Sequence, residues 1–439
     1  MINAFTLLFA LGLLSLAFHR TVWLKPLVIG GLLLSMSLTL SGYEIGLTGF
    51  STNAAIALFE LILEIVLVAL VLHDDEDITI TQTIFLGAAS ILLLQSDTVL
   101  SFVIAFEAVS IISIVLVSYI KTSDQAEGAL KMFIAGSIAT GILLLGVAFY
   151  VMGGGMLLEA IPSDSSWFSV VGLFIMLAAL FYKLTIVPMH GWAADSYALV
   201  RHSHAAILSG VAKTVVAVAA FKMFEPFLLT QISLSVPLLV VLAVITMTLG
   251  NFMALFQKRI AKILAYSSIA QAGYMLLAFA AVESDYASTG LLYMAIAYIF
   301  MQSAVFLLLD TLRKQYDIAT LDDIRGLAKS NKLLSFFFTI QLLSLAGIPL
   351  LAGFLGKVVV FYAGVDAGLW YVVLIALLNS ALSVGYYAWI IKHIYFDDAA
   401  SSRKQFSGVL VLTAQFILLV GTLYFGLFAS SVFSVGSTL

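Results

Sequence analysis

The segment FYKLTIVPMHGWAADSY, residues 181–197, places Lys183 and Pro188 inside an otherwise apolar stretch of the chain. Proline removes a backbone donor and frees a carbonyl, so a helix through this stretch should be interrupted at Pro188. Within a membrane, such non-helical backbone is tolerated where it lines a hydrated cavity. The segment therefore predicts a broken membrane helix with a buried lysine beside the break.

The composition of the whole chain indicates an integral membrane protein. Of its 439 residues, 62% are hydrophobic and only 10% are charged. Apolar side chains on this scale exceed what one soluble core can bury, so lipid must cover much of the surface. The net charge of −4 and the scattered basic residues argue against a nucleic-acid-binding surface. Because cysteine is absent, the chain cannot hold a thiolate-ligated iron–sulfur cluster, a Cys-type zinc site or a disulfide, and we expect no cofactor in it.

Apolar runs predict about fourteen transmembrane helices and an all-α polytopic fold, since a bilayer core needs roughly 20 apolar residues per helix. The runs are residues 3–18, 21–40, 51–72, 78–94, 98–120, 129–152, 167–189, 204–224, 236–256, 263–281, 289–312, 333–362, 369–396 and 408–430. The first run lacks a basic region before it and a small-residue cleavage site after it, so we interpret it as a membrane span rather than a removable signal peptide.

The distribution of basic residues predicts the orientation of these helices. Cytoplasmic loops of membrane proteins carry most of the Lys and Arg. The loops after odd-numbered runs hold fifteen of the 20 basic residues: Arg20, Lys25, Lys121, Lys131, Arg201, Lys258, Arg259, Lys262, Arg313, Lys314, Arg325, Lys329, Lys332, Arg403 and Lys404. The opposite side, with both termini, holds only Lys222. We therefore expect a bacterial cytoplasmic (inner) membrane protein with an even number of spans and both termini on the outer, periplasmic side.

A second broken helix is predicted in the twelfth run. The segment SLAGIPLLAGFLGK, residues 344–357, again combines a proline, Pro349, with a lysine, Lys357. The seventh and twelfth runs are five apart and so cross the membrane in opposite directions, a pattern typical of inverted-repeat transporters. We therefore expect inverted repeats of helices 4–8 and 9–13; the alternative is an isolated proline kink in each helix. The resulting units are three N-terminal helices (1–77), a first five-helix repeat (78–225), a second, inverted repeat (226–398) and a C-terminal helix (399–439).

Four charged residues lie deep within the predicted spans, namely Glu107, Lys183, Lys213 and Lys357. A lysine at the centre of the bilayer costs roughly 2.5–3.5 kcal/mol, so such residues mark ion pathways by default. We interpret the four as a row of titratable groups that pass protons through side-chain or water bridges. The alternative is a set of structural ion pairs that hold the helices together.

Further candidate residues lie outside this row. Glu60 and Glu64 are four residues apart on one face of the third helix, where they would share a proton or meet a partner subunit. His190 follows the break, and His202 and His204 lie at the cytoplasmic start of the eighth helix. Because imidazole titrates near neutral pH, these three would feed protons inward; interfacial hydrogen bonding is the alternative.

The run HDDED, residues 73–77, has the composition of a metal site. It is a short polar connection between two apolar runs, so we expect a solvated loop and no metal there.

Six motifs, in order and spacing, resemble the antiporter-like membrane subunits of respiratory complex I and their relatives in Mrp-type cation/proton antiporters and membrane-bound hydrogenases. They are FEAVSI with Glu107, FYKLTIVPMHGWAADSY with Lys183, LSGVAK with Lys213, KRIAKILAYSSIAQAGYML from Lys258, LDDIRGL from Leu321, and SLAGIPLLAGFLGK with Lys357. A lysine in the twelfth helix differs from the subunit M type, and the lack of a long lateral helix after the fourteenth differs from the subunit L type. The chain is most similar to the subunit N branch.

The resemblance implies a role for each charged residue. Glu107 and Lys183 would form a coupling pair, Lys213 the central relay and Lys357 the group facing the outer exit. The chain departs from the family at the start of the eighth helix, where VRHSHAAIL, residues 200–208, replaces a Pro-rich, PTPV-like entry. This departure draws attention to the histidines of the inner entrance.

The expected function is that of a non-redox, proton-translocating subunit of a translocase that oxidises NADH, or a related donor, and reduces quinone. The donor, flavin, iron–sulfur clusters and quinone would belong to partner subunits, and the chain would contact other membrane subunits and lipid but no nucleic acid. Three alternatives remain open. They are an Mrp-type sodium/proton antiporter subunit, the equivalent hydrogenase subunit, and a purely structural subunit whose charges are locked in pairs.

Overall fold

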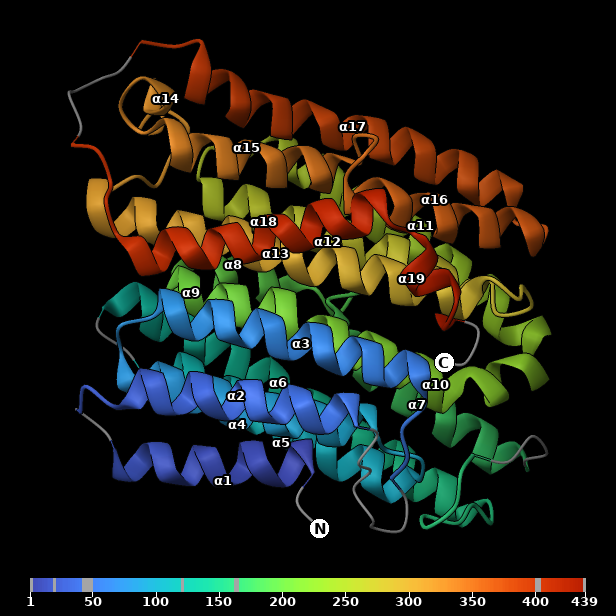
Figure 1. Cartoon of the computed structure of the whole chain (residues 1–439). Coiled ribbons are helices and arrows are strands. Elements are labelled where there is room, and N and C mark those ends of the chain that lie inside the picture. The colour runs from blue at the N-terminus through green and yellow to red at the C-terminus, as the bar shows by residue number, and fades with distance from the viewer. Residues whose placement is uncertain are drawn as a thin grey trace.

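The computed structural model describes residues 3–18, 21–41, 50–119, 122–161, 166–398 and 404–436, and it consists of helices packed side by side (Figure 1). Within these ranges the only extended pairings are the isolated bridges Phe50 to Ser96 and Arg259 to Thr320. The predicted all-α fold is confirmed for the described residues. Arg20, Lys121 and Arg403, which contributed to the predicted orientation, lie outside them.

The helices of the described ranges follow one another in this order: α1 (Ala4–Ala17), α2 (Leu24–Leu40), α3 (Ala54–His73), α4 (Asp77–Leu94), α5 (Val99–Val117), α6 (Ser123–Met152), α7 (Trp167–Leu184), α8 (Gly191–Leu199), α9 (His202–Ala206), the π-helix η1 (Ile207–Ala212), α10 (Lys213–Thr230), α11 (Ile232–Leu255), α12 (Ile260–Ala280), α13 (Ala287–Tyr316), α14 (Leu327–Ser330), α15 (Lys332–Ala346), α16 (Ala352–Asp366), α17 (Trp370–Tyr395), α18 (Val409–Leu427) and α19 (Ser430–Phe433). Within the described ranges, eleven helical stretches are long and apolar enough to cross a membrane, and α1, α2 and α15 are shorter apolar helices.

Each predicted run overlaps one helix or a set of consecutive helices, with differences at the ends. The eighth run was expected to end at residue 224, but α10 continues to Thr230 and includes Pro226. Pro237 likewise lies inside α11, close to its start. Proline removes only its own donor, so a helix can accommodate one within its terminal turns.

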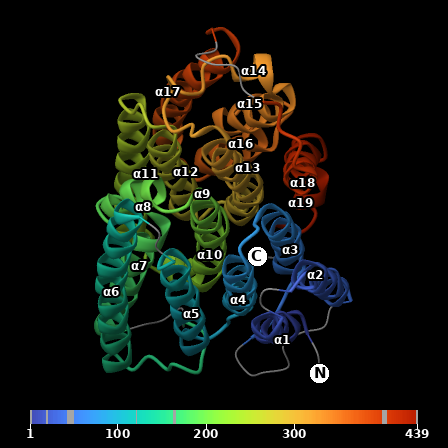
Figure 2. The same cartoon turned by 90° about the vertical axis from the view of Figure 1, so that its left-hand side faces the viewer.

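The centre of the molecule is formed by α10 and α13, as the end-on view of Figure 2 shows. Every residue of α13 from Ala287 to Leu312 is buried. A helix that is apolar on all sides belongs in the interior, and α3, α9, η1, α10, α12, α15, α16 and α18 all pack against α13. By contrast α6 and α17 expose apolar side chains such as Ile138 and Leu378.

Two helices are interrupted at the prolines. Between α7 and α8, the chain from Thr185 to His190 is not helical, and between α15 and α16 the same holds from Gly347 to Leu351. The pair α7–α8 runs in the opposite direction to the pair α15–α16 (Figure 1). Both α7 and α15 end in a left-handed residue, Thr185 with φ 61° and Gly347 with φ 90°, which stops the helix.

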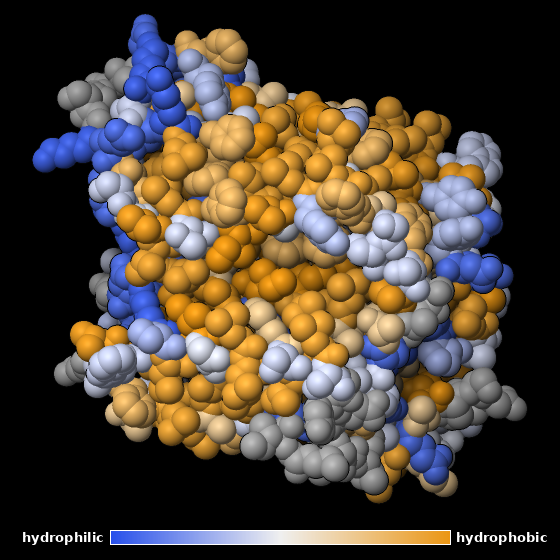
Figure 3. All heavy atoms as spheres, viewed as in Figure 1, coloured by the Kyte–Doolittle hydropathy of each residue, from blue (hydrophilic) through white to orange (hydrophobic). Residues whose placement is uncertain are grey.

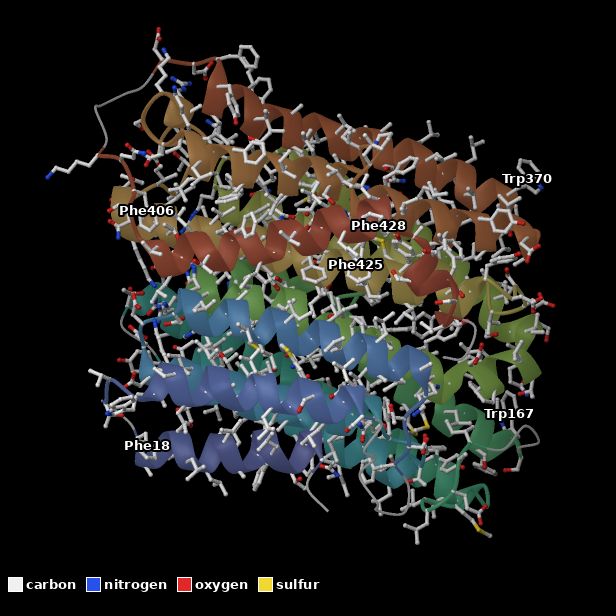
Figure 4. The ribbon with its side chains drawn as sticks, in the orientation of Figure 1. Phe18, Trp167, Trp370, Phe406, Phe425 and Phe428 are labelled. Atoms are coloured by element: carbon white, nitrogen blue, oxygen red, sulfur yellow. The ribbon has the colours of Figure 1, made fainter. Side chains whose placement is uncertain are left out.

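The surface has the form expected of a membrane protein. Apolar side chains cover the middle of the face in Figure 3, while hydrophilic side chains gather toward its left and right edges. Trp167 and Trp370, 69% and 64% exposed, lie at the right-hand end of the bundle, and Phe18 and Phe406 lie at the left-hand end (Figure 4). Exposed Trp side chains are typical of a membrane–water interface, so the end of the bundle that carries Trp167 and Trp370 has the expected composition.

The orientation of the bundle predicts a labelling pattern. Because the chain contains no cysteine, single cysteines introduced at Lys258 and Glu283, exposed residues beyond the two ends of α12, report the side on which each lies. We expect a membrane-impermeant maleimide added to intact cells to label Glu283→Cys, and to label Lys258→Cys only in inverted vesicles. The unsubstituted chain is the control, and labelling of both positions from one side would contradict the orientation.

Candidate functional site

Lys183 lies in the last turn of α7, just before the first break, with 3% of its surface exposed. Its Nζ donates to Ser113 Oγ of α5 at 2.9 Å, and Ser113 Oγ donates in turn to the Val109 carbonyl at 2.6 Å. The neighbouring Tyr182 anchors the end of α7, because its hydroxyl donates to the Met132 carbonyl of α6 at 2.9 Å. Lys183 is thus fixed between α5 and α7 by a neutral hydroxyl.

Glu107 lies on α5 and is half-buried. Its two carboxylate oxygens accept from Thr140 Oγ1 of α6 at 3.1 and 3.0 Å. Among the described residues no ion pair within 4.0 Å joins Glu107 to Lys183, although each group acts electrostatically on the other. Glu107 and Lys183, for which the resemblance implies a coupling pair, therefore lie here as two separate groups, each held by a hydroxyl.

Lys213, at the start of α10, is completely buried. Its Nζ donates to Thr185 Oγ1 at 2.8 Å, to Ser268 Oγ at 2.6 Å and to the Ser268 carbonyl at 3.1 Å. Tyr298 of α13 also donates to Ser268 Oγ, at 2.8 Å. Thr185 belongs to the first break and Ser268 to α12, so Lys213 connects the first break to α12.

A π-helical turn precedes Lys213. The turn η1 lies entirely in the interior and includes Ser209, whose Oγ accepts from Gln302 Nε2 of α13 at 3.3 Å. Gln302 Oε1 and Ser303 Oγ are buried here without a hydrogen-bond partner among the described residues. Widened turns of this kind occur mostly at functional sites, and polar atoms without partners are the places where buried water binds.

Polar residues on α12 extend from Lys213 toward Lys357. Gln271 Nε2 donates to the Leu345 carbonyl at the end of α15, at 3.1 Å. The ring of Tyr274 lies 5.1 Å from Lys357 Nζ, within the range of a cation–π contact. The Tyr274 hydroxyl accepts from Asn251 of α11 at 3.1 Å. Although α12 is apolar overall, it therefore carries a buried polar face between the two lysines.

Lys357 lies on α16, just after the second break, and is 3% exposed. Its Nζ donates to the carbonyls of Leu345 and Ala346 at 3.0 and 3.2 Å, and to Ser380 Oγ of α17 at 3.1 Å. These carbonyls are the last of α15, which the break leaves unpaired. A cation at the carboxyl end of a helix is stabilised by the helix dipole as well as by these bonds.

The three candidate histidines lie beside the first break and on α9. His190 is the residue before α8 and is half-buried. His202 borders a polar cavity of about 470 Å³, together with Arg201 and Asp310. His204 is buried, and its Nε2 lies 3.2 Å from Thr79 Oγ1 of α4.

Glu60 and Glu64 are buried on α3, away from the lysines. Glu60 accepts from Gln95 Nε2 at 2.8 Å, and Glu64 accepts from the hydroxyl of Ser35 on α2. Each carboxylate thus has its own neutral donor.

The prediction of a solvated loop at residues 73–77 was wrong for its first two residues. His73 and Asp74 are 2% and 3% exposed, because Arg201 and α13 cover them. Burial opposes the charge on Arg201, but Asp74 and the neighbouring carboxylates raise the pKa of its guanidinium above the ordinary value. Within the described ranges no cluster of three or more His, Asp or Glu side chains is arranged to hold a metal ion.

The sequence of the chain matches a known protein family. The family described as "NADH:quinone oxidoreductase/Mrp antiporter, TM" matches residues 96–383, well over half of the chain. The chain belongs to this family. The matched region contains all four charges of the row and both breaks.

Relatives of this NADH:quinone oxidoreductase/Mrp antiporter family member carry two kinds of name. "F(420)H(2) dehydrogenase subunit N" of Methanosarcina mazei is 30% identical over 419 residues, 89% of this chain and 85% of the relative. "NADH-quinone oxidoreductase subunit N" of Rubrobacter xylanophilus is 32% identical over 361 residues, 79% of this chain and 74% of the relative.

Solved structures share the fold. A chain of respiratory complex I from Thermus thermophilus is similar with a TM-score of 0.83 and 24% identity, over 96% of this chain and 97% of that one. A chain of the Mrp complex from Dietzia sp. gives 0.88 and 20%, over 98% and 94%.

Sequence reasoning identified the lysines of the site but missed their partners. Ser268, which accepts from Lys213, and Gln271 are three residues apart on α12, and Tyr274 follows three residues later, so each is a neighbour of the next on the helix surface. This periodicity of polar residues in an apolar run was the available signal. No comparable signal marks η1, whose sequence ILSGVA is unremarkable for an α-helix.

The second break predicts the effect of one substitution. Gly347 has φ 90°, and a Cβ there would lie 3.2 Å from Lys357 Cδ. We expect Gly347→Ala to destabilise the break by about 1–2 kcal/mol, the cost of a left-handed non-glycine residue, and to displace the ammonium. A lower thermal midpoint of the purified complex would report the loss of stability. Slower proton pumping would report the displacement of the ammonium. Gly191→Ala is the control, since a Cβ there meets nothing within 4 Å; equal behaviour of the two variants would contradict the analysis.

Proposed function

We propose that this chain is the proton-translocating membrane subunit of a quinone-reducing respiratory complex. The observation that carries the proposal is the row of buried lysines Lys183, Lys213 and Lys357, none of which has a carboxylate within 4.0 Å among the described residues. Structural ion pairs would neutralise such charges. Amines held only by hydroxyls and carbonyls can instead gain and lose protons, which is the property that a relay needs.

The names of the relatives support this function and leave the electron donor open. One relative is a subunit of an F(420)H(2) dehydrogenase and another of an NADH-quinone oxidoreductase. The shared part is then the proton-translocating subunit, whereas donor, flavin, iron–sulfur clusters and quinone belong to partner subunits. The absence of cysteine from this chain agrees with that division, because it removes thiolate ligands for a cluster.

The relay begins at Glu107. A carboxylate close to Lys183 stabilises the protonated amine, and its withdrawal releases the proton. In the structure the two groups are apart, with Glu107 on Thr140 and Lys183 on Ser113. This arrangement corresponds to the open state of the pair, in which the proton of Lys183 is free to move on.

From Lys183 the proton passes toward Lys213 across the first break. In the break, the Thr185 hydroxyl accepts a hydrogen bond from Lys213 Nζ. The polar face of α12 then leads to Lys357, and from there to the outer side. His190, His202 and His204 form the inward approach. The gaps between these groups are bridged by water, which a buried polar path of this kind binds.

The membrane topology is the second part of the proposal. We assign fourteen transmembrane helices, with α7–α8, α9–α10 and α15–α16 each forming one span, and inverted repeats over residues 78–225 and 226–398. The opposite directions of the two broken helices and the lysine beside each break support this assignment. The charge distribution supports both termini on the outer side of the membrane.

Replacement of Lys183 tests the function. We expect Lys183→Ala in the assembled complex to remove the proton flux that this subunit carries, because the first amine of the relay is missing. The measurement is the number of protons pumped per electron in sealed vesicles. Lys392→Ala is the control, since Lys392 lies near an end of α17 and packs on Trp389. An unchanged number of protons pumped per electron in Lys183→Ala would contradict the proposal.

A sodium measurement separates this function from that of an autonomous antiporter. We expect the purified chain in liposomes to show no exchange of sodium for protons, because its relay depends on partner subunits for a driving force. A pH-sensitive dye inside the liposomes reports the exchange after a sodium pulse. Rapid exchange by the chain alone would favour the antiporter alternative.

A further inference from the structure

A second buried titratable group lies at the inner end of the bundle, outside the lysine row. His73 is the last residue of α3 and is 2% exposed. Its Nε2 lies 3.2 Å from Asp310 Oδ2 of α13. Its Nδ1 is buried and has no hydrogen-bond partner among the described residues. Nε2 of the imidazole is therefore held by Asp310, whereas Nδ1 has room for a proton or a water partner.

Asp310 is surrounded by positively charged and hydrogen-bond-donating groups. Lys314 Nζ lies 2.7 Å from its Oδ2, and Arg201 Nε lies 3.8 Å from its Oδ1. The backbone N–H of Ser203 also points at Oδ1, at 3.4 Å. Arg201 is fixed in turn by Asp74 at 2.9 Å and Glu76 at 2.6 Å. A carboxylate with these partners stabilises a positive imidazole beside it.

The polar cavity of about 470 Å³ reaches this pair. Glu76, Arg201, His202 and Asp310 all line it, so water on the inner side has access to the carboxylate that holds His73. A buried histidine whose carboxylate partner borders a polar cavity has a counter-charge beside it and water near that counter-charge, which are the surroundings that a proton-loading group needs.

The pair also adjoins the approach to Lys213. Ser203, whose N–H contacts Asp310, directly precedes His204 on α9. His204 Nε2 is within hydrogen-bond distance of the Thr79 hydroxyl of α4. Asp310 acts electrostatically on His204. Beyond His204 the chain continues into η1 and Lys213.

We propose that His73, paired with Asp310, is the proton-loading group of the inner entrance and passes its proton to His204. This inference rests on the proposed function and adds α3 to the proton path. In the neutral ring Nε2 donates to Asp310 throughout. Nδ1 takes one proton through a bridging water that connects it to the cavity bordered by Asp310, which gives an imidazolium balanced by Asp310. The same proton then leaves Nδ1 for His204 through a bridging water or the Thr79 hydroxyl, and the neutral ring is restored.

The test uses His73→Gln in the complete complex, because the glutamine amide can still donate to Asp310 but cannot carry a proton. We expect proton pumping to fall by about tenfold or more, as for loss of a proton-transfer group. We also expect the solvent deuterium isotope effect on turnover to rise, since proton entry becomes rate-limiting. Added imidazole should restore part of the rate in His73→Gly, where it can occupy the vacated space.

His393→Gln is the matched control. His393 is also buried at a helix end, on α17, and its Nε2 lies 3.6 Å from Asp397 Oδ2, but Asp397, unlike Asp310, does not line the cavity. We expect unchanged pumping and an unchanged isotope effect. Equal changes in the two variants would show a structural role for both histidines and overturn the inference.

Lys183→Ala, measured in the same vesicles, separates the two proposals. If it lowers pumping while His73→Gln pumps normally, the entrance assignment fails and the relay stands. If neither lowers pumping, both fail. Should His73→Gln not assemble, Asp310→Glu provides the second measurement, because it keeps the charge but moves it by one methylene group. A normal isotope effect in an assembled Asp310→Glu complex would overturn the inference.

Discussion

The ammonium of Lys213 has to be solvated inside the membrane without a carboxylate, and the surrounding structure meets this requirement. Its acceptors are the Thr185 hydroxyl and two oxygens of Ser268. Thr185 is available because α7 ends there in a left-handed turn, and Ser268 is available because α12 carries polar residues in its buried face. The left-handed end of α7 and the polar residues of α12 thus provide the neutral acceptors that a buried amine needs at the centre of the bundle.

The same requirement is met at Lys357 with different atoms. There the break exposes the last carbonyls of α15, and Lys357 reaches back across the break to Leu345 and Ala346. Gly347 permits this approach because it turns the chain away without a side chain. One break thus provides a hydroxyl and the other provides carbonyls, yet each gives a lysine neutral acceptors. Neutral acceptors hold the ammonium in place while leaving it able to release its proton.

Local rules were sufficient to predict the broken helices, because proline and a mid-span lysine act within a few residues of their position. The partners of the lysines depend on packing and could not be obtained in this way. Glu107 and Ser113 are six residues apart on α5, a rise of about 9 Å. Lys183 lies at the level of Ser113, and its distance from Glu107 follows from how far α7 extends beside α5. The structure holds Glu107 and Lys183 on separate hydroxyls, a separation that only the helix positions determine, and the coupling of the two charges stays a prediction.

The inner end of the bundle shows the same limit more strongly. His73 and Asp310 are 237 residues apart in the chain, and no local pattern links the HDDED run to α13. The family match begins at residue 96 and so excludes α3, although α3 packs against α13 and ends at the carboxylate of Asp310. Helices outside the matched region therefore contribute a titratable side chain, and not only apolar packing, to the place where α13 meets α9. In the proposed path, a proton that enters there meets α3 before it meets the two helix breaks.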